Sequence, residues 1–186
     1  MSVPTGLDRL FRETAVRSGL LDAGYDVVDS PIGPLLVAAT DRGVVRISFD
    51  PDPHHHIELL ARLAGPRILR APLQVDAVRT ELDEYFDGRR RGFDLRVDLR
   101  GATPFTARVL AALARVPFGE TATYADLAAR AGQPKAARAV GAVMNRNPIP
   151  IVLPCHRIVG TGGGLVGYAG GLERKEALLR LEGVLL

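Results

Sequence analysis

The sequence has one cysteine, no tryptophan and few aromatic residues, and each scarcity excludes a class of protein. A lone cysteine cannot form an intramolecular disulfide, so a disulfide-stapled secreted domain is excluded and a reducing cytoplasm is expected. Because 47% of residues are hydrophobic but only 5% are aromatic, the core is expected to be mainly aliphatic. No run of about 18 apolar residues occurs, which predicts no membrane span. The first residues are mixed in charge and do not resemble a signal peptide.

Charge is distributed unevenly along the 186 residues, although the net charge is only +3. Residues 101–186 carry 10 Lys and Arg against 5 Asp and Glu, whereas residues 1–100 carry 14 against 16. A basic C-terminal half is compatible with a polyanionic partner such as DNA, and equally with an ordinary solvated surface.

The apolar pattern divides the chain into an N-terminal extension (1–24), a first domain (25–100) and a second domain (101–186). Leu7, Leu10, Phe11 and Ala15 share one face of a helix predicted over residues 5–18. Apolar runs at 35–39 and 44–49 predict a β-hairpin. Helical spacing from 75 to 86 predicts a helix, and alternation from 93 to 99 predicts a half-buried strand. The fold class is therefore α+β, and the second domain begins with helices.

Three consecutive histidines, His54, His55 and His56, follow two prolines and are assigned to a loop. Three histidines could also bind a metal. However, adjacent side chains of an extended segment point to opposite sides, and no other His or Cys is near in sequence. A solvated loop is the preferred interpretation.

Residues 103–145 contain three helix signals. Thr103 or Pro104 begins a helix that runs to about residue 115. Thr123 and Asp126 match a capping box, which predicts a helix from Tyr124 to about residue 131. After Gly132, a helix is predicted from residue 134 to about 145, making a helix-turn-helix candidate.

The last of these helices has two different faces. Its inward face contains Ala137, Val140, Gly141 and Met144, and its other face contains Lys135, Arg138, Ala142 and Asn145. Small and basic residues on one face suit a close approach to a DNA groove, while a helical hairpin with no nucleic-acid role is the alternative.

The only cysteine, Cys155, precedes His156 and follows an apolar run at 149–153 that is predicted to be a strand. A thiol beside an imidazole is a candidate nucleophile, whereas a small buried hydrophobe is the alternative. Neighbouring strand residues point apart, so a water bridge between thiol and imidazole is easier to build than direct contact. His156 then needs a carboxylate to set its tautomer, and Glu182 is the best-placed candidate because the chain returns to the core there. Arg157 or a helix terminus could lower the thiol pKa.

Three segments resemble the C-terminal domain of the O6-alkylguanine-DNA alkyltransferases, also called methylated-DNA–protein-cysteine methyltransferases. They are PFGETATYADLAARAG, PKAARAVGAVMNRNPIPIVLPCHRIVG and GYAGGLERKEALLRLEG, and they occur in order. The first domain is similar through DSPIGPLLVAATDRGVVRISF, ELDEYFDGRRRGFDL and LRGATPF. The resemblance covers residues 25–183. It implies a ribonuclease H-like first domain and a second domain with a winged-helix-like helix-turn-helix.

The resemblance also implies a function. Cys155 would accept the alkyl group from O6 of guanine in duplex DNA, once only and irreversibly. His156 would deprotonate it through water, Glu182 would orient His156, and Asn147 would be a hinge. Whether O4-alkylthymine is also a substrate stays open.

The family's binding residues map onto further positions of this sequence. Tyr124 would turn the nucleotide out by pushing its phosphate, and Arg138 would fill the gap left in the base stack. The DNA-binding set is Tyr124, Lys135, Ala137, Arg138 and Asn145, and the substrate pocket is Tyr124, Val159, Gly160 and Tyr168. Contact is expected in the minor groove with little sequence specificity, by a protein that is monomeric in solution.

The sequence departs from the family pattern in two respects. Leu110 stands where a Trp is usual, which should alter packing but not chemistry. The cysteines that bind structural zinc in some members are missing, so no metal and no cofactor are expected. Two alternatives remain, a non-catalytic binder of damaged DNA and a cysteine hydrolase; Cys155 argues against the first, and the lack of a second histidine in residues 101–186 against the other.

Overall fold

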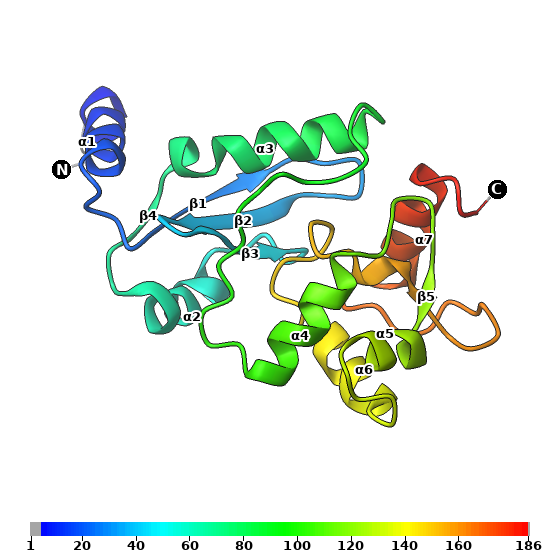
Figure 1. The fold of residues 1–186 in the computed structure, drawn as a ribbon. Coiled ribbons are helices and arrows are strands. Elements are labelled where there is room, and N and C mark those ends of the chain that lie inside the picture. The colour runs from blue at the N-terminus through cyan, green and yellow to red at the C-terminus, as the bar shows by residue number, and fades with distance from the viewer. Residues whose placement is uncertain (1–4, 186) are drawn as a thin grey trace. The chain divides into compact units, whose positions relative to one another are not determined.

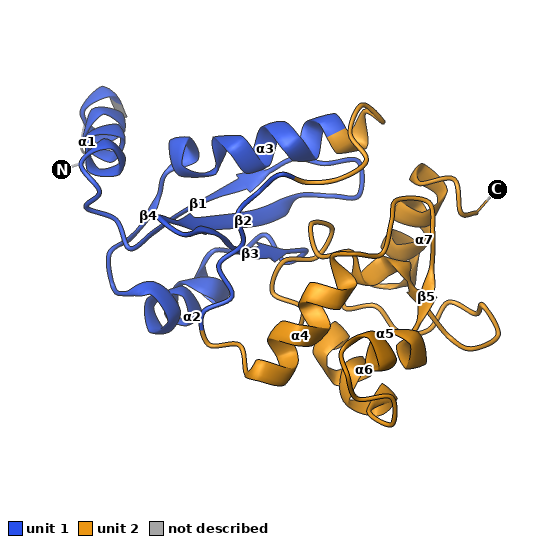
Figure 2. Cartoon of the chain, in the orientation of Figure 1, with its two compact units in different colours: residues 1–84, 94–100 blue, residues 85–93, 101–186 orange. Residues whose placement is uncertain are grey.

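The structure is a computed structural model and describes residues 5–185. The described chain forms two compact units. The first comprises residues up to 84 together with 94–100, and the second comprises residues 85–93 together with 101 onward (Figure 2). The chain therefore passes from the first unit into the second and back again before residue 101.

The first unit is built on a four-stranded mixed sheet with the order β3-β2-β1-β4. Its strands are β1 (Ala23–Val28), β2 (Leu35–Thr40), β3 (Gly43–Ser48) and β4 (Ile68–Arg70). β2 pairs antiparallel with both β1 and β3, whereas β4 is parallel to β1. The predicted hairpin is confirmed as β2 and β3.

Helices α2 (His54–Ala64) and α3 (Pro72–Phe86) cover opposite faces of this sheet (Figure 1). Tyr25 packs on the face that carries Leu60 of α2, in a cluster with Ala38 and Val45. Its neighbour Gly24 faces the other way, where an added Cβ would lie 2.6 Å from Gln74 of α3. Successive strand residues alternate between faces, so β1 packs against α2 through Tyr25 and against α3 through Gly24.

The predicted N-terminal helix is confirmed as α1 (Thr5–Arg17), but it does not bury its apolar stripe. Ala15 is buried, whereas Leu7, Leu10 and Phe11 are about 60% exposed. The helix is held instead by Arg12, whose Nη1 donates to the carbonyl of Arg70 at 2.8 Å.

The loop predicted around the three histidines is wrong, because α2 begins at His54. Asp52 Oδ1 accepts from the backbone N–H of His54 at 3.0 Å, which satisfies a free amide of the first turn. His55 Nδ1 lies 2.7 Å from Asp50 Oδ2, and His56 Nε2 lies 3.0 Å from the carbonyl oxygen of Asp50. The histidines are thus tied to the segment before the helix.

The strand predicted over residues 93–99 is also wrong, since only Val97 forms a bridge, with Val44. Next to it, Asp98 Oδ2 accepts from Thr40 Oγ1 at 2.6 Å and Arg100 pairs with the same carboxylate. Gly43, at φ 134°, allows the close approach, because an added Cβ would lie 2.1 Å from the carbonyl oxygen of Arg96. Backbone pairing is limited to two bonds, from the N–H of Val44 to the carbonyl of Arg96 at 2.9 Å and from the N–H of Asp98 to the carbonyl of Val44 at 2.7 Å.

The second unit is mostly helical. It contains α4 (Pro104–Leu113), β5 (Ala122–Thr123), α5 (Tyr124–Arg130), α6 (Ala137–Asn145), the 3₁₀ turn η1 (Cys155–Arg157), β6 (Ile158–Val159) and α7 (Leu172–Leu181). β5 and β6 form a short parallel pair. Thr103 caps α4 by accepting from the N–H of Thr106, with Pro104 at the first turn, as predicted.

A first unit built on a sheet and a mostly helical second unit together match the predicted α+β fold class. Within the part of the chain that the structure describes, no helix is long and apolar enough to cross a membrane.

Candidate functional site

Cys155 begins the 3₁₀ turn η1, and the segment before it is a tight turn. The strand predicted over residues 149–153 is wrong, because only a single bridge joins Pro150 and Leu153. Asn147 closes the turn: its Nδ2 donates to the carbonyl of Leu153 at 2.7 Å and its Oδ1 accepts from the N–H of Ile149 at 3.1 Å. Prolines lack the N–H that a strand ladder needs, so this proline-rich run favours side-chain closure.

The turn holds Ile151 in the left-handed region, at φ 76°. A β-branched residue there costs on the order of 1–3 kcal/mol and persists only where the surroundings over-determine the conformation. Ile151 is fully buried, and the bonds of Asn147 flank it. The backbone that presents Cys155 is therefore held rigidly.

His156 follows Cys155 in the same turn and points to the carboxylate of Glu182. Its Nε2 lies 2.9 Å from Glu182 Oε1, and both side chains are fully buried. Because a carboxylate only accepts, the imidazole proton lies on Nε2 and Nδ1 is the basic nitrogen. Nδ1 is buried and makes no hydrogen bond to the described protein atoms. The ring can therefore take up a proton at Nδ1.

Arg157 binds the same carboxylate from the other side. Its Nη2 and Nε donate to Glu182 Oε1 and Oε2 at 2.8 and 2.9 Å, and its Nη1 donates to the carbonyl of Val116 at 2.6 Å. This forked geometry is the strong form of a charge-assisted hydrogen bond. The alternative in which Arg157 activates the thiol is not supported, since its guanidinium serves Glu182 and Val116.

These contacts set the ionisation of the pair. Burial alone would raise the pKa of Glu182, but hydrogen bonds from His156 and Arg157 outweigh it and lower the pKa to about 2. Burial lowers the pKa of His156, although Glu182 opposes this shift. At neutral pH the site therefore holds a carboxylate and a neutral imidazole, which is the form that can act as a base.

The thiol itself is protonated at rest. Burial raises the pKa of Cys155 to about 11, although a hydrogen bond with Asn147 and the positive charge of Lys175 act in the opposite direction. A buried thiol with such a pKa needs a base to become a nucleophile, and His156 is adjacent in the chain.

Lys175 is a residue of this site that sequence reasoning missed. It is fully buried on α7, and its Nζ donates to the carbonyls of Ile158 and Val166 at 2.6 and 2.9 Å. The available signal was its spacing, since Lys175 shares a helical face with Leu178, Leu179 and Glu182. A lysine on an otherwise apolar helix face is expected to be buried, and a buried ammonium group needs hydrogen-bond acceptors.

The four residues assigned to the substrate pocket, Tyr124, Val159, Gly160 and Tyr168, all belong to the second unit. Val159 is buried in β6, and an added Cβ at Gly160 would lie 3.5 Å from the carbonyl oxygen of Gly164. Burial, and then the charge that Cys155 carries when ionised, raise the pKa values of Tyr124 and Tyr168. That shared electrostatic effect shows that both phenols lie near the thiol.

The helix-turn-helix is formed by α5 and α6. The predicted capping box is present: Thr123 Oγ1 accepts from the N–H of Asp126 at 3.1 Å, and Asp126 Oδ2 accepts from the N–H of Thr123 at 2.9 Å. Gly132, at φ 77°, ends α5. The start of α5 approaches the middle of α6, where an added Cβ at Gly141 would lie 3.9 Å from the Tyr124 ring.

Helix α6 begins at Ala137, three residues later than predicted, because Pro134 and Lys135 form a turn. Its two faces are as expected. Val140 and Met144 are buried and Ala137 is half-buried. The exposed face carries Arg138, Ala142 and Asn145, and Lys135 is exposed in the turn before it.

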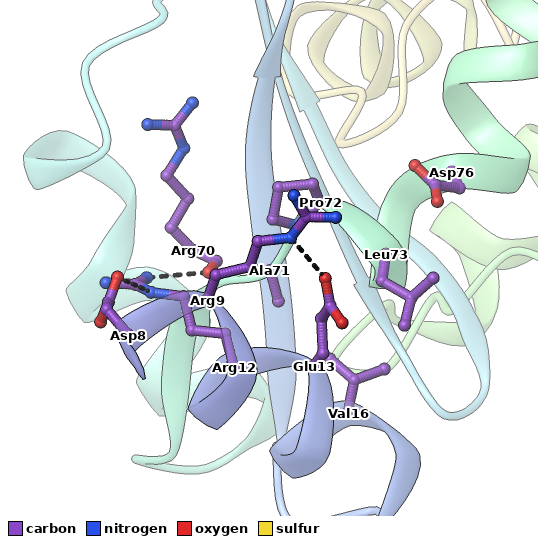
Figure 3. A pocket seen from close by; sticks show the side chains of 10 residues that line it. All are labelled: Asp8, Arg9, Arg12, Glu13, Val16, Arg70, Ala71, Pro72, Leu73 and Asp76. Carbon is purple, nitrogen blue, oxygen red and sulfur yellow. Dashed lines mark hydrogen bonds and ion pairs between the residues drawn. The ribbon is translucent and has the colours of Figure 1, made fainter. Parts of the chain in front are cut away.

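Neither a metal centre nor the hollow beside α1 belongs to this site. Within residues 5–185, no three His, Cys, Asp or Glu side chains are grouped so as to hold a metal ion. A hollow of about 490 Å³ lies between α1 and the start of α3 (Figure 3). Its arginines are paired within the first unit, Arg9 with Glu13 and Arg12 with Asp8. The residues that line this hollow include no cysteine, serine, threonine or histidine.

Two family models match this chain, one over most of the first unit and one over most of the second. The DNA-binding domain of 6-O-methylguanine DNA methyltransferase matches residues 104–184, and the ribonuclease-like domain of the same protein matches residues 24–99. The chain belongs to the 6-O-methylguanine DNA methyltransferase family. The family resemblance read from the sequence and the expected ribonuclease-like first domain are thereby confirmed.

Individual relatives support the same family assignment. A methylated-DNA–protein-cysteine methyltransferase of Methanosarcina barkeri is 43% identical over 159 residues, covering 85% of this chain and 96% of the relative. One from Mycobacterium bovis is 41% identical, covering 85% and 91%. A structure of Mycobacterium tuberculosis OGT in complex with DNA matches with a TM-score of 0.74 at 39% identity, covering 86% and 92%. The described fold of the family thus extends over nearly all of this chain after α1.

Proposed function

We propose that this protein repairs DNA by transferring an alkyl group from O6 of guanine to its own Cys155. The observation that carries the proposal is the buried series Cys155, His156 and Glu182, in which a protonated thiol adjoins a neutral imidazole held by a carboxylate. Membership of a family of DNA methyltransferases and a relative solved with DNA make DNA the partner.

The chemistry follows from the resting protonation states. His156 Nδ1 takes the thiol proton through a bridging water, and Glu182 stabilises the imidazolium that forms. The thiolate sulfur then attacks the alkyl carbon, an S–C bond forms, and the C–O6 bond breaks with its electron pair going to guanine. Guanine takes up a proton and is restored. The product is a thioether on Cys155, which no group of the site can cleave, so each molecule acts once.

The target base must leave the stack, because a buried thiol cannot reach an atom inside a duplex. The exposed face of α6 suits the minor groove, since Ala142 and Asn145 are small and Arg138 can enter the gap left by the base. Tyr124 would push the target phosphate, and the exposed Lys135 would contact the DNA backbone. Little sequence specificity is expected, because alkylation damage can occur anywhere in DNA and contacts to phosphates carry no sequence information.

The flipped base would bind beside Tyr168, Val159 and Gly160. Tyr168 and Tyr124 lie near the thiol, and Val159 and Gly160 begin the loop that Lys175 ties to α7. Asn147 holds the turn that precedes Cys155, which supports a fixed backbone position for the nucleophile.

The test is intact mass after incubation with excess O6-methylguanine duplex, followed by peptide mapping. The expected result is one added methyl group on Cys155, not exceeded with time, and none in Cys155→Ala, which should still bind the duplex. No mass change with the lesion intact would indicate a damage sensor. Loss of the lesion without mass gain would indicate a true catalyst, such as a hydrolase, and would refute the mechanism.

The flipping role of Arg138 has its own test. Arg138→Ala should slow transfer from duplex DNA far more than transfer from the free modified base, because only the duplex requires extrusion. Arg130→Ala, at the end of α5, is the matched control. Equal slowing on both substrates would contradict the flipping role.

A further inference from the structure

Tyr85 is a buried residue that joins the active site from the far end of α3. It lies 97 residues before Glu182 in sequence, yet it belongs to the second compact unit, together with the segment up to residue 93 (Figure 2). Its side chain is fully buried. A buried phenol needs a hydrogen-bond partner, and the identity of that partner connects it to catalysis.

The partner is the carboxylate that holds His156. Tyr85 Oη donates to Glu182 Oε1 at 2.7 Å, the same oxygen that accepts from His156 Nε2 at 2.9 Å. Arg157 donates to both carboxylate oxygens, and the N–H of Gly119 donates to Oε2 at 3.3 Å. A carboxylate offers about four lone-pair sites, so these donors occupy all of its capacity.

The phenol ring is fixed by aromatic neighbours of the same unit. Its centroid is 5.3 Å from that of Phe86, 5.3 Å from that of Phe93 and 6.2 Å from that of Phe118. The guanidinium of Arg157 stands over the Phe118 ring at 5.9 Å. The hydroxyl therefore cannot turn away from Glu182 without disturbing this cluster.

We infer that Tyr85 is a positioning residue for alkyl transfer, which acts by holding the Glu182 carboxylate in the plane and charge state that His156 requires. This inference rests on the proposed function of Cys155 and adds a residue from the segment matched to the ribonuclease-like domain. Tyr85 acts only as a donor here, since burial and the charge of Glu182 raise its pKa far above the ordinary value.

The hydroxyl also tunes the basicity of His156. By donating to Glu182 it withdraws negative charge from the carboxylate that stabilises the imidazolium. Arg157 and Lys175 are the other charged groups that act on His156, and both disfavour the imidazolium. Removing the hydroxyl should therefore raise the pKa of His156 and loosen the orientation of its ring.

The test is Tyr85→Phe, which keeps the ring and removes only the donor, with Tyr25→Phe in the first unit as the matched control. Single-turnover methyl transfer from saturating O6-methylguanine duplex is measured against pH, with duplex affinity and the urea midpoint measured in parallel. We expect a roughly tenfold slower transfer with unchanged affinity, which is a part of the roughly 10²–10⁴-fold that a general base contributes. The acid limb of the pH–rate profile should move to higher pH.

A purely structural role would shift the urea midpoint but leave the pH profile in place, and an unchanged rate and profile would overturn the inference. If the wild-type protein transfers no methyl group at all, the proposed function fails. Titration of the His156 imidazole by NMR separates the two failures: an unchanged His156 pKa in Tyr85→Phe overturns the inference whether or not methyl is transferred, and a raised one supports the action of Tyr85 on His156 through Glu182.

Discussion

Replacing Glu182 with glutamine should destabilise the protein far more than any other single carboxylate-to-amide change on its terminal helix region. Glu182 is buried and accepts hydrogen bonds from Tyr85, His156, Arg157 and the N–H of Gly119. The amide removes the negative charge and turns one acceptor into a donor, which then faces another donor. Arg157 is left as a buried cation without a counter-charge.

The loss of folding stability in Glu182→Gln can be estimated in two ways. Removing one partner of a buried ion pair costs about 3–5 kcal/mol. Hydrogen bonds from His156 and Arg157 overcome the opposing effect of burial and lower the pKa of Glu182 from 4.5 to about 2, which corresponds to about 3 kcal/mol of stabilisation of the ionised form. Since domains are stable by about 5–15 kcal/mol, this is a large fraction of the total.

Urea unfolding followed by circular dichroism measures the loss, because the chain has no tryptophan to report by fluorescence. With a slope of about 2 kcal/mol per molar urea, the midpoint should fall by roughly 2 M. Glu176→Gln is the control: Glu176 pairs with Arg180 on the exposed side of α7, and its loss should change stability by less than about 0.5 kcal/mol. A loss of under about 1 kcal/mol in Glu182→Gln would refute the argument.

Three further outcomes are expected. Acid should destabilise the wild type as pH falls from 4.5 towards 2, because the folded-state pKa of Glu182 is depressed and the unfolded state binds the proton first; Glu182→Gln should flatten this part of the pH–stability curve. Alkylation of Cys155 by iodoacetamide should accelerate with pH up to about 11, and a plateau below pH 8 would contradict a burial-raised thiol pKa. Lys175→Met should leave two carbonyls unpaired at a cost of about 1–3 kcal/mol each and increase hydrogen exchange at the Gly160 amide, which donates to the Gly164 carbonyl within the loop, whereas unchanged exchange would show that Lys175 does not hold that loop.

Local signals in the sequence predicted most of the helices because their information lies within a few residues. The capping box of Thr123 and Asp126, the cap at Thr103 and the stop at Gly132 each satisfy backbone groups three or four residues away. The β2–β3 hairpin is equally local. Such elements depend little on what packs against them.

The wrong predictions concern segments whose structure depends on bonding partners, and not on their own composition. Residues 149–153 and 93–99 have strand-like composition, but each makes only one isolated bridge and lacks a partner strand along its length, and side chains, Asn147 in one case and Asp98 in the other, add to the few backbone bonds. The histidine segment was assigned to a loop from its prolines, although Asp52 supplies a hydrogen-bond acceptor for the first turn of α2. Pairing and capping partners decide such segments, and composition does not.

For the site, the sequence by itself determined which thiol can accept an alkyl group, because Cys155 is the only cysteine, and through the family resemblance it nominated His156 as the base. Tertiary structure alone decided their chemistry. Burial sets the thiol and imidazole pKa values, and Glu182 is oriented by donors from α3, from the turn after α4 and from η1. Lys175 does lie on the apolar face of its helix, but its bonds to the Ile158 and Val166 carbonyls, and the bond of Tyr85 to Glu182, exist only once the chain has folded.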